Sequence, residues 1–171
     1  IQRTNSSSTP YNNSTAIGRI TAPPTTAGGI ADYNLTFTNN NISNTNFGLY
    51  FTGATSNNIT FKENNFIVTG NTINATVTGI NAIHSRIWTI DGNRINQQAT
   101  SSDLNFVGIA IQNGADFLSV SGNSIKMNER GGTGISVTTY ANSTGVTSLM
   151  NMSNNEIINK ATVTARYNIM L

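Results

Sequence analysis

Residues 118–125 read Leu-Ser-Val-Ser-Gly-Asn-Ser-Ile, and four other stretches repeat this pattern: residues 35–42, 59–66, 88–95 and 150–157. The first, third and eighth positions are apolar, the second and fourth are mostly polar, and the sixth is always asparagine. These asparagines follow one another at steps of 24, 29, 30 and 32 residues: Asn40, Asn64, Asn93, Asn123 and Asn155. Recurrence at such a period is typical of repeat architectures, in which each repeat is one structural unit stacked on its neighbours.

The alternation of apolar and polar residues within each repeat predicts half-buried β-strands. A second alternating stretch follows each copy and begins at Gly48, Gly79, Gly108 and Gly134, with a degenerate fifth copy that begins at Arg166. Equivalent residues of successive repeats are expected to stack about 4.8 Å apart. The expected inward columns are Leu35, Ile59, Trp88, Leu118 and Met150; Phe37, Phe61, Ile90, Val120 and Met152; and Ile42, Phe66, Ile95, Ile125 and Ile157.

The connections between these strands vary in length, so insertions are expected at two edges of the stack, as is usual for repeat folds. Residues 1–15 are polar and are predicted to form a flexible arm or linker, and residues 16–171 form the repeat domain. The chain begins at Ile1 and ends within an expected strand. We therefore expect the domain to continue in a longer chain or to stack on another chain.

The composition narrows the function classes. Only 9% of the residues are charged, against 28 Asn, 25 Thr and 16 Ser, which suits β-strands rather than helices. The net charge of +2 comes from scattered side chains, so no nucleic-acid partner is expected. There is no cysteine and no apolar run long enough to cross a membrane. No cofactor and no metal site are expected, since the carboxylates are dispersed along the chain.

The five asparagine-containing copies resemble the right-handed parallel β-helix of the pectin-lyase-like folds over roughly residues 33–171. This resemblance implies a single-stranded all-β solenoid of about five rungs, with the five asparagines forming a ladder at a bend. It also implies that carbohydrate-active members carry their site on the outward positions of the first strand.

Those outward positions form two expected columns: Thr36, Thr60, Thr89, Ser119 and Asn151; and Thr38, Lys62, Asp91, Ser121 and Ser153. Glycoside hydrolysis uses two carboxyl groups, and Asp91 is the only carboxylate in either column. Glu63 follows one place after Lys62 in the turn, and Lys62 is expected to pair with Asp91 on the adjacent rung. No catalytic residue is therefore assigned, although Asp91, Glu63 and Lys62 are the first positions to test.

The hydroxyl column suggests a different use. Thr36, Thr60, Thr89 and Ser119 could present hydrogen-bonding groups to a glycan, and Tyr50, outward on a second strand, could stack on a sugar. We expect a non-enzymatic structural and adhesive domain that assembles end to end. The resemblance points to bacterial surface proteins and phage tail or fibre proteins, and so to an extracellular, cell-surface or virion location. The alternative is a polysaccharide lyase or glycoside hydrolase domain.

Overall fold

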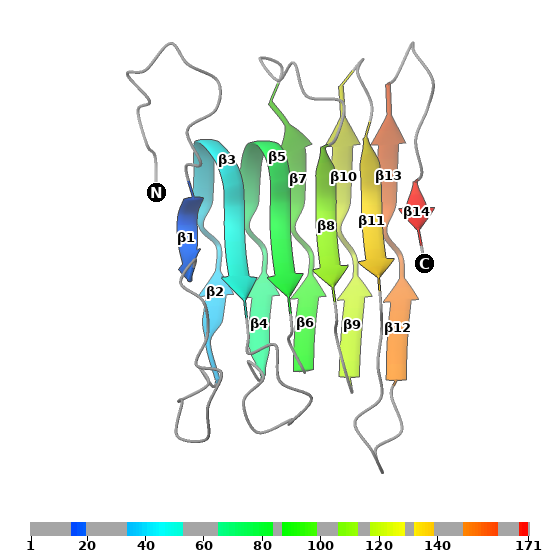
Figure 1. Ribbon diagram of the computed structural model, residues 1–171. Helices are drawn as coiled ribbons and strands as arrows, with labels where there is room; N and C mark the ends of the chain where they lie inside the picture. Colours follow the sequence, from blue (N-terminus) through cyan, green and yellow to red (C-terminus); the bar gives the residue numbers. More distant parts are fainter. Residues whose placement is uncertain are drawn as a thin grey trace.

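The computed structural model describes residues 15–19, 34–52, 65–83, 87–98, 106–112, 117–128, 132–138, 149–160 and 168–170. All regular structure in these ranges is β-strand, arranged in two parallel sheets (Figure 1). The described residues include no helix long and apolar enough to span a membrane. The arm predicted for residues 1–15 lies outside these ranges except for Thr15, and the short apolar segment after it forms a strand.

One sheet has five strands and the other has nine. The five-stranded sheet contains β2 (Thr36–Thr38), β4 (Phe66–Thr69), β6 (Ile87–Asp91), β9 (Phe117–Ser121) and β12 (Leu149–Ser153). The nine-stranded sheet contains β1 (Thr15–Arg19), β3 (Asn41–Thr52), β5 (Thr72–Ile83), β7 (Arg94–Gln97), β8 (Val107–Gln112), β10 (Ser124–Met127), β11 (Thr133–Thr138), β13 (Glu156–Asn159) and β14 (Ile169–Met170).

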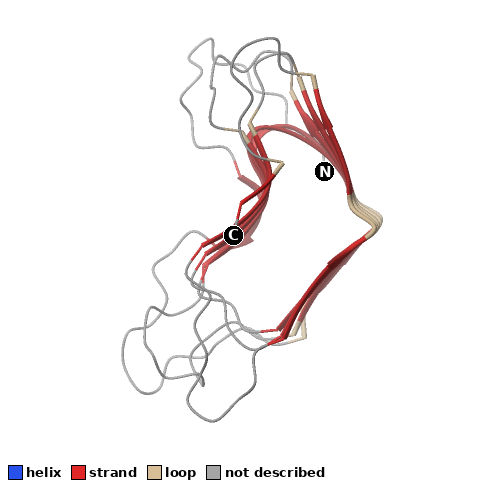
Figure 2. Cartoon of the chain, turned by 90° about the vertical axis from the view of Figure 1, so that its right-hand side faces the viewer, coloured by secondary structure: helices blue, strands red, loops and turns tan. Residues whose placement is uncertain are grey.

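The chain passes from the five-stranded to the nine-stranded sheet once in every repeat. Each strand pairs in parallel with the equivalent strand of the next repeat, so that Trp88 lies beside Leu118 and Ile90 beside Val120. The nine-stranded sheet is strongly curled, because β5 pairs with both β7 and β8, which follow one another along the chain. Figure 2 looks along the stack and shows successive repeats lying over one another, with one tight bend between the two sheets.

The second repeat begins seven residues later than the sequence pattern predicted. Phe66 pairs with Trp88 and Val68 with Ile90, so residues 66–73 form this repeat rather than residues 59–66. The places predicted for Ile59 and Phe61 are therefore held by Phe66 and Val68. The place predicted for Phe66 is held by Ile73, which pairs with Ile42 and Ile95.

The backbone at the bend explains this shift. The fifth residue of each repeat has a positive φ, between 53° and 63°, at Asn39, Gly70, Gly92, Gly122 and Asn154. Glycine and asparagine adopt this left-handed conformation at the least cost. The predicted copy would have placed Glu63 there, whereas the observed copy offers glycine. The left-handed position thus selects the register of the second repeat.

The residue after each left-handed position is an asparagine, and these asparagines form a hydrogen-bonded row: Asn40, Asn71, Asn93, Asn123 and Asn155. In all four neighbouring pairs the Nδ2 group of one asparagine donates to Oδ1 of the next at 2.9 Å. The same Oδ1 also accepts the backbone N–H of the preceding asparagine, at 2.9 to 3.1 Å. The prediction of Asn64 in this row is wrong, because Asn71 bonds to both Asn40 and Asn93.

Each inner asparagine also donates to two main-chain oxygens at the end of the five-stranded sheet, one in its own repeat and one in the preceding repeat. Nδ2 of Asn93 bonds to the carbonyl oxygen of Val68 at 2.8 Å and to that of Asp91 at 3.1 Å. Asn123 repeats this arrangement with Ile90 and Ser121. Asn71, Asn93 and Asn123 are only 1% exposed. The amide thus bonds to main-chain groups of two successive repeats that are buried at the bend.

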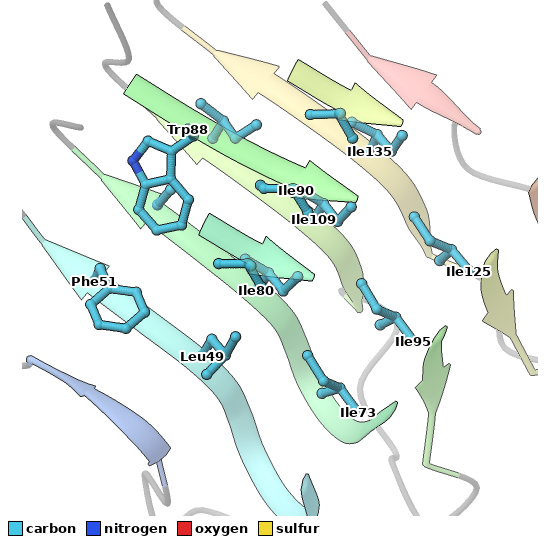
Figure 3. Packing of buried hydrophobic residues seen from close by; sticks show 14 of the residues in the cluster. Leu49, Phe51, Ile73, Ile80, Trp88, Ile90, Ile95, Ile109, Ile125 and Ile135 are labelled. Atoms are coloured by element: carbon cyan, nitrogen blue, oxygen red, sulfur yellow. The ribbon is translucent and has the colours of Figure 1, made fainter. Parts of the chain in front are cut away.

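The core is continuous along the stack, as the apolar columns predict. Leu49, Ile80, Ile109 and Ile135 follow one another from strand to strand on the nine-stranded sheet (Figure 3). Three aromatic side chains also pack together in this core. The Phe66 and Trp88 rings stack with centroids 4.6 Å apart, and the centroid of the Phe51 ring lies 5.8 Å from that of Trp88. Burial of such apolar side chains contributes roughly 1.5–3 kcal/mol each.

The glycine column also has a steric cause. A Cβ atom on Gly108 would lie 2.5 Å from Cγ2 of Ile125 and 2.6 Å from the carbonyl oxygen of Gly134. Gly48 and Gly79 meet the next repeat in the same way. After Gly134 the next position is held by Asn168, since Ile135 pairs with Ile169. The predicted equivalence of Arg166 with these glycines is therefore wrong by two residues.

Substitution of two glycines tests separately the close packing around Gly108 and the left-handed backbone conformation at Gly92. Gly108→Ala should lower the free energy of unfolding by about 1–3 kcal/mol, because the added methyl group overlaps main-chain and core atoms. Gly92→Asn should be tolerated, because no atom lies within 4 Å of its Cβ position and asparagine occupies the same place at Asn39 and Asn154. Urea denaturation measures both; equal losses would contradict the distinction.

Removal of one amide tests the asparagine row. Asn93→Ala should cost about 3 kcal/mol or more, because it leaves several buried donors and acceptors without partners. The matched control is Asn151→Ala, an exposed asparagine, whose effect should stay within about 0.5 kcal/mol. Chemical denaturation of the two variants decides; similar unfolding midpoints would show that the row contributes nothing particular.

Asn93→Asp adds a pH test of the same site. The aspartate keeps the shape but loses the donors, and its charge is buried, so its pKa in the folded state should lie above the unfolded value. A group whose pKa is higher in the folded than in the unfolded state stabilises the fold at pH values below its unfolded pKa. This contribution is lost as the pH rises through the folded pKa. The gap in stability between Asn93→Asp and the parent should therefore widen from about pH 4 to pH 7, as measured by urea midpoints.

Candidate functional site

The outer face of the five-stranded sheet carries the outward side chains of β2, β4, β6, β9 and β12. Because the strands are parallel and in register, these side chains form straight rows that run along the stack. The middle row is Thr36, Ile67, Thr89, Ser119 and Asn151. The row next to the bend is Thr38, Thr69, Asp91, Ser121 and Ser153.

Three of the predicted ligand residues are brought together here, and the second repeat differs. Thr36, Thr89 and Ser119 share the middle row, but the place predicted for Thr60 is held by Ile67. The neighbour of Asp91 in register is Thr69, which holds the place predicted for Lys62. Thr60, Lys62 and Glu63 themselves lie outside the described residues.

Hydrogen bonds between repeats fix the side chains of the row next to the bend. The Ser121 hydroxyl donates to Oδ1 of Asp91 at 2.7 Å, and the hydroxyls of Thr38 and Thr69 lie 3.2 Å apart. Asp91 is exposed. The row therefore offers hydroxyl groups and one carboxylate in set positions, within reach of a ligand that lies on the sheet.

The arrangement limits the chemistry of this face. Among the described residues of the outer face, Asp91 is the single carboxylate, whereas glycoside hydrolysis uses two. No cluster of three metal-binding side chains occurs within the described ranges. What the described side chains can do is donate and accept hydrogen bonds.

Tyr50 lies elsewhere, on the nine-stranded sheet. It is half-buried in β3, with its ring edge-on to that of Phe47 at a centroid distance of 5.1 Å. Its neighbours in register are Gly18 and Asn81. Tyr50 therefore does not belong to the same face as Thr36, Thr89 and Ser119.

Two side chains of the outer face were not singled out from the sequence. Phe117 and Leu149 begin β9 and β12, pair with each other in register, and are 36% and 57% exposed. The signal was present, because each directly precedes the first inward residue of its repeat and so must point outward. They border the middle row on the side away from the bend.

Comparison of the chain with protein-family models, with curated proteins and with solved structures finds no match. Any role of the outer face therefore follows from its own side chains. These are hydroxyls, an amide, one carboxylate, the half-buried Ile67 and two adjacent exposed apolar groups.

The hydrogen bond between Ser121 and Asp91 should matter little for stability. Both groups can bond to water when separated, so Ser121→Ala should change the free energy of unfolding by no more than about 0.5 kcal/mol. Denaturation beside the Asn93→Ala variant gives the comparison. A loss as large as that of Asn93→Ala would mean that the outer face, rather than the asparagine row, holds the repeats together.

Proposed function

We propose that the chain is a right-handed parallel β-helix of about five rungs, similar to the pectin-lyase-like folds, whose asparagines form a continuous ladder. We further propose that it serves as a structural and adhesive segment of an extracellular, cell-surface or virion fibre protein. Its role is to hold a surface in a fixed shape and to present that surface to a partner.

The observation that carries this proposal is the hydrogen bonding between repeats at the bend. Strand pairing and the asparagine amides both connect each repeat to the next, from Asn40 to Asn155. A force along the stack is thereby shared among many short bonds within a continuous apolar core. Such an arrangement suits a load-bearing scaffold.

The surface chemistry supports an adhesive role. The outer face of the five-stranded sheet presents hydroxyl and amide groups with little charge, which suits hydrogen bonding to a glycan.

End-to-end assembly is part of the proposal. Met150 and Ile169 belong to inward columns but are exposed, whereas their neighbours Leu118 and Ile135 are buried. A further layer of strands, from the same polypeptide or from a second copy, would cover them. Unpaired strand edges favour this kind of addition.

A polysaccharide lyase or glycoside hydrolase is the alternative function, and it would depend on Asp91, with Glu63 and Lys62 as the accessory positions to test. The register favours it less than the sequence did, because Thr69 rather than Lys62 neighbours Asp91. Asp91→Asn separates the two functions, since it would abolish turnover in an enzyme while leaving the fold intact.

The test of the structural role is kinetic. The protein should unfold slowly in denaturant and resist proteolysis within the described strands for hours, because opening one repeat breaks strand and amide bonds together. A panel of polysaccharides incubated with the protein should release no oligosaccharide. Rapid unfolding would contradict a load-bearing role, and product release that disappears in Asp91→Asn would establish the enzyme instead.

A further inference from the structure

The outer face of the five-stranded sheet combines apolar and hydrogen-bonding groups in one line on each of two adjacent strands. Strand β9 presents Phe117, Ser119 and Ser121 outward, and β12 presents Leu149, Asn151 and Ser153. The two sets lie about 4.8 Å apart along the stack. Strand β6 extends the polar part with Thr89 and Asp91.

Phe117 is placed where a ring can be covered by a ligand. Its side chain is 36% exposed and stands beside the equally outward Leu149. The other large exposed apolar side chains of the described residues lie elsewhere: Met150 and Ile169 on inward columns, and Ile158 on the nine-stranded sheet. In register Phe117 lies between Ile87 and Leu149, and the hydroxyl of Ser119 follows two residues along the same strand. An aromatic ring with hydroxyl groups on one side suits a partner with an apolar face and a polar rim.

A sugar ring has this form, because C–H groups cover its faces and hydroxyl groups surround it. A pyranose stacked on Phe117 would bring its hydroxyl groups toward Ser119 and toward the row next to the bend. There, Ser121 and Asp91 already hold each other at 2.7 Å, so less freedom is lost on binding.

The charge of the face selects among glycans. Asp91 is the one charged side chain among the described residues of the middle row, the row next to the bend and the pair Phe117 and Leu149. Its neighbours in register are Thr69 and Ser121, and neither is a cation. Arg94 and Lys126 lie past the bend, on the nine-stranded sheet. A uronate or sulfate group would therefore meet a carboxylate without a neutralising partner.

From these observations we infer that the outer face binds a neutral polysaccharide, laid along the stack with Phe117 as the stacking platform. This inference rests on the proposed adhesive function and names its ligand class and binding residues. Ser119, Thr89 and Asp91 supply the hydrogen bonds. The carboxylate of Asp91 discriminates against acidic chains.

Calorimetric titration with hydroxyethylcellulose and galactomannan, at physiological salt, tests the inference. Phe117→Ala should weaken binding to the preferred neutral polymer at least tenfold, because the stacking surface is lost. The matched control is Ile158→Ala, which removes an apolar side chain of nearly equal exposure, 37%, from the other sheet. This variant should bind as the parent does, and circular dichroism should show both variants folded.

Polygalacturonate supplies the acidic arm of the experiment. The parent should bind it more weakly than the neutral polymer, and Asp91→Asn should narrow that difference at least threefold. The inference is overturned if the parent binds no neutral polymer at millimolar concentration, or if Phe117→Ala and Ile158→Ala bind equally well.

A second copy of the chain is the other partner that could cover this face. A parent protein that dimerises in sedimentation experiments, with the dimer lost in Phe117→Ala and no polysaccharide bound, would also overturn the inference and assign the face to a second copy. Slow unfolding and the absence of turnover would still hold in that case. The failure of the ligand assignment is therefore distinguishable from the failure of the structural role.

Discussion

A parallel stack of strands has to turn tightly between its two sheets, and the main-chain groups at that turn need partners. Asn71, Asn93 and Asn123 supply them, because each buried amide bonds to carbonyl oxygens of its own and the preceding repeat and to the asparagines before and after it. The left-handed residue just before each asparagine gives the backbone its direction. Sheet register, core columns and outward rows all follow from this pair of positions.

The bend also decides which surface the molecule offers. Once Gly70 and Asn71 fix the second repeat, Ile67 and Thr69 join the outward rows, and Asp91 has a hydroxyl neighbour on each side. The outer face therefore carries less charge than the sequence alone suggested. This favours the proposed binding surface, with its hydroxyl groups and exposed ring, over the catalytic alternative.

Much of the fold could be predicted from the sequence, because inward positions alternate strictly with outward ones and the asparagine recurs in every repeat. Four of the five row members, the columns of the later repeats and the glycine column were predicted correctly. The second repeat was not, since residues 59–66 and 66–73 both satisfy the apolar pattern. The two candidate registers differ at the fifth position, which would be Glu63 in one and is Gly70 in the other. Only the need for a left-handed residue there distinguishes them, and that need arises from stacking against neighbouring repeats. The end of the glycine column at Asn168 was missed for a similar reason: pairing between strands sets it, not local composition.

The central claim is that the side-chain amides of the row are bonded within the protein rather than to water. Hydrogen exchange of the asparagine Nδ2 protons, followed by nuclear magnetic resonance, tests it most directly. The account predicts that the amides of Asn71, Asn93 and Asn123 exchange far more slowly than that of the exposed Asn151. Exchange of Asn93 as fast as that of Asn151 would contradict it.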